Sequence, residues 1–235
     1  RKRAEELLEL VEKTEAEFAV KEETIGGDIH IGGGETRIMR HLAMIMSEIR
    51  EEYPGIRYHI HSGNSEDVTE RLYKGLLDFG VLIQPADLTK YDYVNLPEKD
   101  AWGVITRKDS PLAAKRSIAR QDLLGEPLLL SRQAIRRSTA KNEFLEWFKD
   151  DFEKMDVVGT FNLVYNAAIL AEAGLGHIVS LDGLVNTTES GTLCFRLLEP
   201  RLETGLNIVW KKYQVFSPAA EVFLKRIQER FGGTQ

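Results

Sequence analysis

The chain has 235 residues and a mass of 26.7 kDa, which is enough for two domains of about 100 residues each. Hydrophobic residues make up 43% and charged residues 29% of the sequence, a balance that excludes intrinsic disorder. With 31 Lys and Arg against 37 Asp and Glu, the net charge is -6. A chain this acidic is a poor nucleic-acid binder by itself, because phosphate contacts need clustered basic residues. The single cysteine, Cys194, excludes an internal disulfide and a cysteine-based zinc cluster.

The sequence also predicts a chain that does not cross a membrane. The most apolar segment, residues 163–181, is interrupted by Asn166, Glu172 and His177, so it does not offer the run of about 18 apolar residues that a membrane span needs. The N-terminus has no apolar run that would mark a secretory signal. We therefore expect the chain to be cytoplasmic, although a processed chain could have lost its signal.

Residues 1–23 are predicted to form one helix. Ala4, Val11 and Phe18 recur every seven residues with Leu7 and Thr14 between them, which is a short heptad stripe among Glu, Lys and Arg. A stripe this short needs a partner helix or a longer helix upstream, or it packs on its own domain as an ordinary amphipathic helix. The abrupt start without Met indicates a fragment of a longer helix.

The next residues alternate strands with helices. Strands are expected at 28–31, 56–61 and 77–83, and helices between them at 38–49 and from residue 65 to about 75. Such alternation is typical of βαβ units with a parallel sheet covered by helices.

A second block of the same order starts near Trp102. Strands are expected at 102–106, 127–130, 157–161 and 176–181, with helices at about 139–152 and 163–173. A last strand at 206–210 and a helix at 218–230 are too few to stand alone. If they return to the first block, two crossover segments join the domains, and a cleft between them could open and close around a ligand.

Three short turns lie between a strand and a helix N-terminus, at residues 33–36, 63–65 and 131–133. The first N–H groups of a helix lack internal partners, so such turns bind anions and polar small molecules at the carboxyl ends of parallel strands. The alternative for each turn is that Thr36, Ser65 or Ser131 only caps its helix. Taken together, the three turns favour a ligand-binding cleft.

Enzyme motifs are not found. Gly32–Gly34 does not continue to a dinucleotide fingerprint because Arg37 stands where a glycine is needed, and the sequence has no Walker A pattern or nucleophile elbow. His59 and His61 share a strand face without a third ligand, which is a weak metal signal. We therefore predict no catalytic residues, no metal and no cofactor.

Seven segments in order carry a family resemblance. They are Gly27–Gly32, Tyr53–Ile56, Gly63–Val81, Asp109–Leu112 with Ser110 for the usual His, Asp122–Leu123, Ala173–Ile178 with an inserted His177, and Ser217–Leu224. Together they resemble the effector-binding region of LysR-type transcriptional regulators over nearly the whole chain.

The resemblance implies an α/β fold of two Rossmann-like subdomains, as in type 2 periplasmic binding proteins, joined by two crossover strands. Regulatory subdomain I would contain residues 24–100 and 206–235, and subdomain II residues 101–205. Residues 1–23 would be the end of the linker helix that pairs with another subunit.

The resemblance also implies partners. A small-molecule inducer would bind in the cleft, the chain would form a homodimer or homotetramer, and DNA would be bound only through a winged helix-turn-helix domain absent from this sequence. The rival interpretations are a solute-binding protein of a transport system with the same fold and an enzyme that uses the cleft.

Site positions follow from the matched turns. Thr36 or its backbone N–H is the first candidate to contact an effector carboxylate. Glu35 departs from the family pattern, and it would either repel an anionic inducer or accept a hydrogen bond from an amine or hydroxyl. Replacing Thr36 by Val together with Ser131 by Ala should abolish the ligand response at little cost to the apo protein. The full set of predicted ligand-binding residues is Gly34, Glu35, Thr36, Asn64, Ser65, Ser131, Arg132, Gln133, Phe161 and Asn162.

Overall fold

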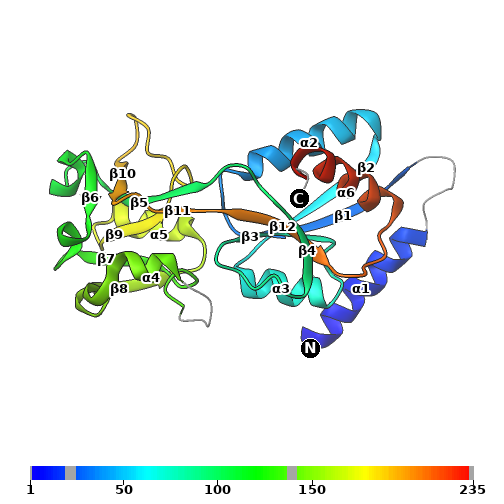
Figure 1. The fold of residues 1–235 in the computed structure, drawn as a ribbon, viewed down its shortest axis with the longest axis horizontal. Coiled ribbons are helices and arrows are strands. Elements are labelled where there is room, and N and C mark those ends of the chain that lie inside the picture. The colour runs from blue at the N-terminus through cyan, green and yellow to red at the C-terminus, as the bar shows by residue number, and fades with distance from the viewer. Residues whose placement is uncertain (1, 19–24, 137–141, 233–235) are drawn as a thin grey trace. The chain divides into compact units, whose positions relative to one another are not determined.

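The computed structural model describes residues 2–18, 25–136 and 142–232 (Figure 1). The chain forms two compact units. The first unit comprises residues 1–34, 38–98 and 206–235, and the second comprises residues 35–37 and 99–205. The main chain therefore leaves the first unit after Glu98 and returns to it after Gly205.

The first unit is built on a five-stranded sheet in the order β2-β1-β3-β12-β4. β1 pairs in parallel with β2 and β3, whereas β12 is antiparallel to both β3 and β4. The sheet is thus mixed, because the returning strand β12 enters it in the opposite direction. The elements of this unit are α1 (Lys2–Phe18), β1 (Gly26–Gly33), α2 (Met39–Glu52), β2 (Gly55–Ser62), α3 (Ser65–Tyr73), β3 (Phe79–Ile83), β4 (Tyr91–Asn95), β12 (Leu206–Lys211) and α6 (Pro218–Phe231).

Helices cover both faces of this sheet (Figure 1). Ile29 and Ile31 of β1 point to one face, where they pack with the apolar stripes of α2 and α6 in one buried cluster. Phe223 of α6 is fully buried in that cluster and contacts Phe79 edge-on, with 5.0 Å between ring centroids. The other face packs against α3 through a second buried cluster. Alternation along the strands therefore gives each face its own helices.

The second unit contains a seven-stranded sheet. The path β6-β10-β5-β9-β7-β8 is extended by β11, which pairs with β5. β7 is parallel to both β8 and β9, and β5 is antiparallel to β9 and β10. Its elements are β5 (Asp100–Arg107), β6 (Ser117–Ala119), β7 (Pro127–Ser131), α4 (Glu143–Phe148), β8 (Asp156–Phe161), α5 (Val164–Glu172), β9 (His177–Leu181), β10 (Leu193–Glu199) and β11 (Glu203–Thr204), with 3-10 turns at Pro111–Ala114, Arg120–Leu123 and Lys149–Lys154.

Packing in the second unit is tight where strands β5 and β10 meet. Gly103 of β5 faces the ring of Phe195, and a Cβ at this position would come within 2.5 Å of the Arg196 carbonyl oxygen. The small helix α5 lies over the same sheet and buries Val164 and three alanines against β5, β7 and β9. Small residues in α5 let the helix approach the sheet closely.

Helix α1 packs on the first unit through polar side chains and leaves its apolar side exposed. Lys74, which directly follows α3, donates a hydrogen bond from Nζ to Glu6 Oε1 at 2.9 Å. In contrast, Leu7, Leu8 and Val11 are 63%, 62% and 50% exposed, and Ala4 is exposed as well. The helix prediction is confirmed for Lys2–Phe18, and the rest of 1–23 lies outside the described residues. As the alternative expected, α1 packs on its own domain, but it does so through Glu6 and Lys13, and these four apolar residues stay exposed.

Two further predictions need correction. The helix expected at 139–152 is only Glu143–Phe148 in the described part, followed by a 3-10 turn, because Lys149 adopts a positive φ of 52° that ends the α-helix. Residues 139–141 of that prediction lie outside the described residues. The predicted parallel sheet is parallel only in part of each unit, since β4, β5, β10 and β12 introduce antiparallel pairs.

Within the described ranges, every helix is too short or too polar to cross a lipid bilayer. The same ranges contain no group of three or more His, Cys, Asp and Glu side chains placed to hold a metal ion. His59 instead lies 3.1 Å from Asp28 Oδ1, and His61 contacts Asp67.

Candidate functional site

The two predicted turns of the first unit are neighbours. Parallel pairing of β1 and β2 brings Gly33 beside Ser62, and the Gly63 N–H donates to the Gly33 carbonyl at 3.0 Å. A Cβ on Gly34 would lie 3.0 Å from the Ile83 side chain, so the turn after β1 packs closely against the end of β3. The carboxyl ends of the parallel strands thus meet at one edge of the sheet, as predicted.

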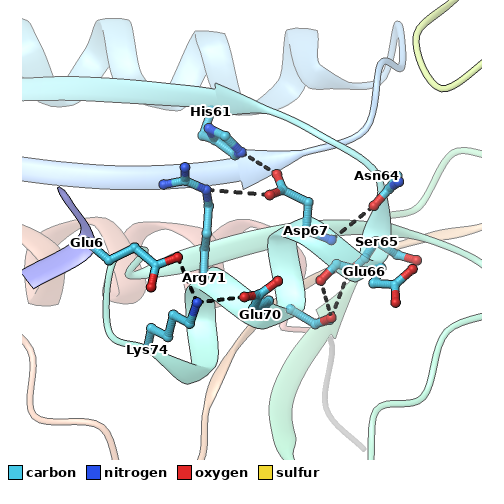
Figure 2. A network of polar contacts seen from close by, with 10 residues as sticks. Glu6, His61, Asn64, Ser65, Glu66, Asp67, Glu70, Arg71 and Lys74 are labelled. Atoms are coloured by element: carbon cyan, nitrogen blue, oxygen red, sulfur yellow. Dashed lines mark hydrogen bonds and ion pairs between the residues drawn. The ribbon is translucent and has the colours of Figure 1, made fainter. Parts of the chain in front are cut away.

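Asn64 caps helix α3. Its Oδ1 accepts a hydrogen bond from the Asp67 backbone N–H at 2.9 Å, and Figure 2 shows this contact beside the His61–Asp67 pair. Ser65 begins the helix, and its carbonyl accepts from the Thr69 hydroxyl at 2.7 Å. The cap of α3 is therefore Asn64 and not Ser65, which was the residue expected to cap this helix. A ligand contact by either residue stays a prediction.

Residues 35–37 pack with the second unit. Glu35 Oε2 accepts a hydrogen bond from the Val164 backbone N–H at 2.7 Å. This N–H opens α5, whose N-cap residue, Leu163, supplies no side-chain acceptor. The Glu35 carboxylate therefore occupies the helix end where the unpaired N–H groups and the helix dipole favour a negative charge.

Thr36 and Arg37 meet two carboxylates. The Thr36 hydroxyl donates to Asp100, which is fully buried at the start of β5. Arg37 donates from Nη1 to Asp182 Oδ2 at 3.1 Å, and its Nε lies 3.6 Å from Asp100 Oδ1. Three carboxylates and one guanidinium thus surround this turn, and the directly linked groups carry a formal charge of about -2, which disfavours an anionic ligand.

This geometry corrects the expected effect of the Thr36→Val variant. Because the Thr36 hydroxyl hydrogen-bonds a buried carboxylate, its removal takes a donor from Asp100 and should destabilise the apo protein by about 1–3 kcal/mol. The variant is therefore unsuitable as a silent probe of ligand binding.

The predicted turns of the second unit also lie together. Ser131 pairs with Phe161 across β7 and β8, and the Arg132 N–H donates to the Phe161 carbonyl at 2.8 Å. The Gln133 carbonyl accepts from the Arg136 N–H at 3.2 Å, which closes a tight turn. Asn162 follows Phe161 directly and precedes the N-terminus of α5 by two residues.

The backbone thus brings Glu35, Ser131, Arg132, Phe161 and Asn162 to the ends of β7 and β8 and to the start of α5. Sequence reasoning missed the partners of the first turn, which are Asp100, Asp182 and the Val164 N–H. Each lies more than 60 residues from residues 35–37 in the chain, and none belongs to a motif, so no local pattern marks them.

The chain thus forms two α/β units, and each has polar turns at the ends of parallel strands. The chain belongs to the LysR substrate binding domain family, whose model matches residues 22–232. This family consists of regulators of transcription and not of enzymes.

Curated relatives agree with this assignment. An uncharacterized HTH-type transcriptional regulator, YvbU of Bacillus subtilis (strain 168), is 26% identical over 231 residues, covering 97% of this chain and 75% of the relative. The HTH-type transcriptional activator CmpR of Synechocystis sp. (strain ATCC 27184 / PCC 6803 / Kazusa) is 28% identical over 184 residues, covering 77% of this chain and 59% of its own length. The chain thus spans between 59% and 75% of these two regulators.

Solved structures confirm the fold. CbnR, a LysR family transcriptional regulator, superposes with a TM-score of 0.75 at 16% identity, covering 97% of this chain and 78% of that chain. The effector binding domain of QuiR in complex with shikimate gives a TM-score of 0.71 at 13% identity, covering 88% of this chain and 98% of that chain. The predicted α/β fold of the type 2 periplasmic-binding-protein kind is therefore confirmed.

Proposed function

We propose that this chain is the effector-sensing regulatory domain of a LysR-type transcription regulator and that a small molecule binds between its two units. Family membership over residues 22–232 carries the proposal. The QuiR effector domain, which holds shikimate, supports it by its shared fold. In this proposal residues 24–100 with 206–235 and residues 101–205 are the two regulatory subdomains.

The proposed effector contacts are the predicted residues at the strand ends. Gly34, Glu35 and Thr36 form one group, Asn64 and Ser65 the second, and Ser131, Arg132, Gln133, Phe161 and Asn162 the third. Because Glu35, Asp100 and Asp182 are already present near the first turn, we propose an effector that offers amine or hydroxyl donors there. Any anionic group of the effector would then contact Arg132, which is exposed at the end of β7.

We further propose that the chain self-associates through α1. The exposed Ala4, Leu7, Leu8 and Val11 form an apolar stripe at heptad spacing, which a second α1 helix would cover. In the full-length protein this stripe would belong to the linker helix that leads to DNA-binding domains. A regulator that contacts DNA in this way would act in the cytoplasm.

Signalling requires that the effector bind two arrangements of the units with different free energies, because a ligand with equal affinity for both shifts nothing. The linker helices would carry the change to the DNA-binding domains. The whole regulator, DNA contacts included, is thus a proposal that rests on the family.

A thermal-shift screen of polar metabolites tests the effector site. A true effector raises the melting temperature by mass action, by an amount that grows with its concentration. Ser131→Ala and Asn162→Ala should reduce the shift by at least half, whereas Ser47→Ala on α2 should leave it unchanged. A confirmed ligand whose shift is the same in all four proteins would refute this placement of the site.

Sedimentation of the chain tests self-association. We expect a dimer or tetramer for the wild type and a monomer for Leu7→Glu combined with Val11→Glu. A wild-type monomer with α1 present would instead favour a solute-binding protein of the same fold.

A further inference from the structure

A buried carboxylate joins helix α1 to the sheet of the first unit. Asp78 Oδ1 accepts a hydrogen bond from Lys13 Nζ at 2.7 Å, and Asp78 Oδ2 accepts from the His30 backbone N–H at 2.8 Å. The Asp78 N–H donates back to the His30 carbonyl at 2.8 Å. The side chains of Lys13 and Asp78 are only 9% and 8% exposed, so this ion pair lies almost entirely out of water.

Two further contacts hold the same side of α1. Lys13 Nζ also donates to the Gly75 carbonyl at 3.2 Å. Glu6, one heptad earlier, pairs with Lys74 at the C-terminal end of α3 (Figure 2). We call these contacts of Lys13 and Glu6 the α1 clamp. The Lys13–Asp78 pair is its buried part, and a buried pair is stable only while each charge keeps its partner.

His30 lies next to this ion pair, because its backbone N–H donates to the same Asp78 carboxylate that Lys13 contacts. The ring of His30 stacks on that of His59, with 4.7 Å between centroids and 15° between planes. Burial lowers the pKa of His30, and the nearby Lys13 and His59 lower it further, against the attraction of Asp78 and Asp28. The neutral imidazole is therefore the form that fits beside a docked Lys13.

The groups that face His30 come from α1, β1, β2 and the residue that precedes β3. Lys13 belongs to α1, Asp78 precedes β3, and Asp28 lies on β1 itself. On β2, His59 contacts both His30 and Asp28, and Arg57 pairs with Asp28 at 2.8 Å. Because Arg57 and His59 share Asp28, Asp78 is the carboxylate for which a protonated His30 and Lys13 compete.

We propose that the α1 clamp is a proton-sensitive connection, which loosens when His30 is protonated and frees α1 from the first unit. Since docking lowers the pKa of His30, docking is strongest above about pH 6.5, the usual histidine pKa, and weakens as the pH falls below it. The clamp does not depend on the proposed function, but its use to tune the signal that α1 carries rests on that function.

Amide hydrogen exchange of α1 in the whole chain, measured by NMR and corrected for intrinsic exchange rates, tests the proposal. Between pH 7.5 and 5.5 the protection of residues 5–11 should fall by up to tenfold per pH unit, the limit for linkage to one proton. His30→Gln should make the protection independent of pH, because glutamine does not titrate. His41→Gln, which removes a histidine on α2 that pairs with Glu98, is the matched control and should behave as the wild type.

A second variant tests whether docking of α1 and the pKa of His30 are linked. Lys13→Met should remove the protection of α1 at neutral pH and should raise the pKa of His30, read from its ring resonances. An unchanged pKa would show that docking of α1 does not lower the pKa of His30, and it would overturn the proposal. The proposal is equally overturned if His30→Gln keeps the wild-type pH dependence, or if α1 is unprotected in the wild type at every pH.

Discussion

The carboxylate of Glu35 should be measurable as the cap of helix α5. Val164 is buried, its N–H donates to Glu35 at 2.7 Å, and the N-cap residue Leu163 supplies no side-chain acceptor. Loss of a capping side chain costs about 0.5–2 kcal/mol, and loss of a negative charge at a helix N-terminus costs about 0.3–1 kcal/mol. These effects overlap, so Glu35→Ala should destabilise the protein by about 1.5 kcal/mol.

Glu35→Gln separates the two contributions, because the amide keeps an acceptor for the Val164 N–H but lacks the charge. We expect a loss of about 0.5 kcal/mol for this variant, the size of the dipole effect. Glu189→Ala removes an exposed carboxylate of the same unit and serves as the control, with no measurable change expected.

The assay is urea unfolding followed by the fluorescence of Trp102 and Trp147, both of which are buried in the second unit. The order of stability should be wild type and Glu189→Ala together, then Glu35→Gln, then Glu35→Ala. The reasoning is wrong if Glu35→Ala unfolds at the wild-type urea concentration, since the contact between residue 35 and α5 would then contribute nothing.

Three other perturbations follow from the packing and charges. Gly103→Ala should destabilise the second unit by about 3 kcal/mol, because its Cβ would overlap the Arg196 carbonyl, and wild-type stability in urea would contradict the tight β5–β10 packing. Phe223→Ala should cost about 3–5 kcal/mol by leaving a cavity between α6 and the first sheet, and a calorimetric loss under about 1 kcal/mol would show that the site collapses. Burial alone would raise the pKa of Asp28, but hydrogen bonds from Arg57 and from a neighbouring histidine lower it, and the net pKa is lowered. The Arg57–Asp28 pair therefore adds stability to the folded protein that is lost as the pH falls below 3.8. Arg57→Gln should reduce that acid-range dependence only slightly, because Arg57 is largely exposed and its charge is screened by water. An unchanged pH profile of the urea midpoint would show that the pair adds nothing.

Much of the first unit could be predicted because its elements are strongly periodic. The strand at Gly26–Gly33 alternates buried and less buried residues, and α2 repeats its apolar residues at helical spacing until Tyr53. Both signals are local, so they do not depend on contacts that the sequence hides. The return of Leu206–Lys211 to the first sheet needed the additional argument that a lone strand and helix cannot fold by themselves.

Three strands of the second unit were not predictable in the same way. Ser117–Ala119 and Glu203–Thr204 are three and two residues long, too short for a pattern. Leu193–Glu199 forms a strand of seven residues, but polar and apolar residues do not alternate along it. Cys194 and Phe195, for example, are adjacent and both apolar. The end of α4 depends on the positive φ of Lys149, a conformation that lysine rarely adopts and that its sequence does not mark.

In the candidate site, too, the local sequence marked some features, whereas long-range contacts that it does not mark set the others. Turns rich in Gly, Asn and Ser marked the carboxyl ends of parallel strands, because these residues are needed for tight turns and helix caps. Their long-range partners were hidden, and they change the chemistry. Thr36 was expected to face a ligand carboxylate, whereas its hydroxyl donates to the buried Asp100. Whether any of these residues binds an effector stays a prediction.

The two faces of α1 should act independently, and this separation can be tested. Glu6 and Lys13 lie one heptad apart and fix how the helix is rotated on the first unit, while Leu7 and Val11 point away from it. A partner helix that covers the exposed stripe would therefore take its orientation from the first unit, although it makes no contact with the clamp.

Lys13→Met should leave the dimer dissociation constant within a few-fold of wild type, because the stripe is intact. Leu7→Glu with Val11→Glu should abolish the dimer yet leave the lowered pKa of His30 in place, because the clamp is intact. If loss of the dimer restores an ordinary pKa at His30, the docked position of α1 depends on the partner helix, and the clamp by itself does not hold it.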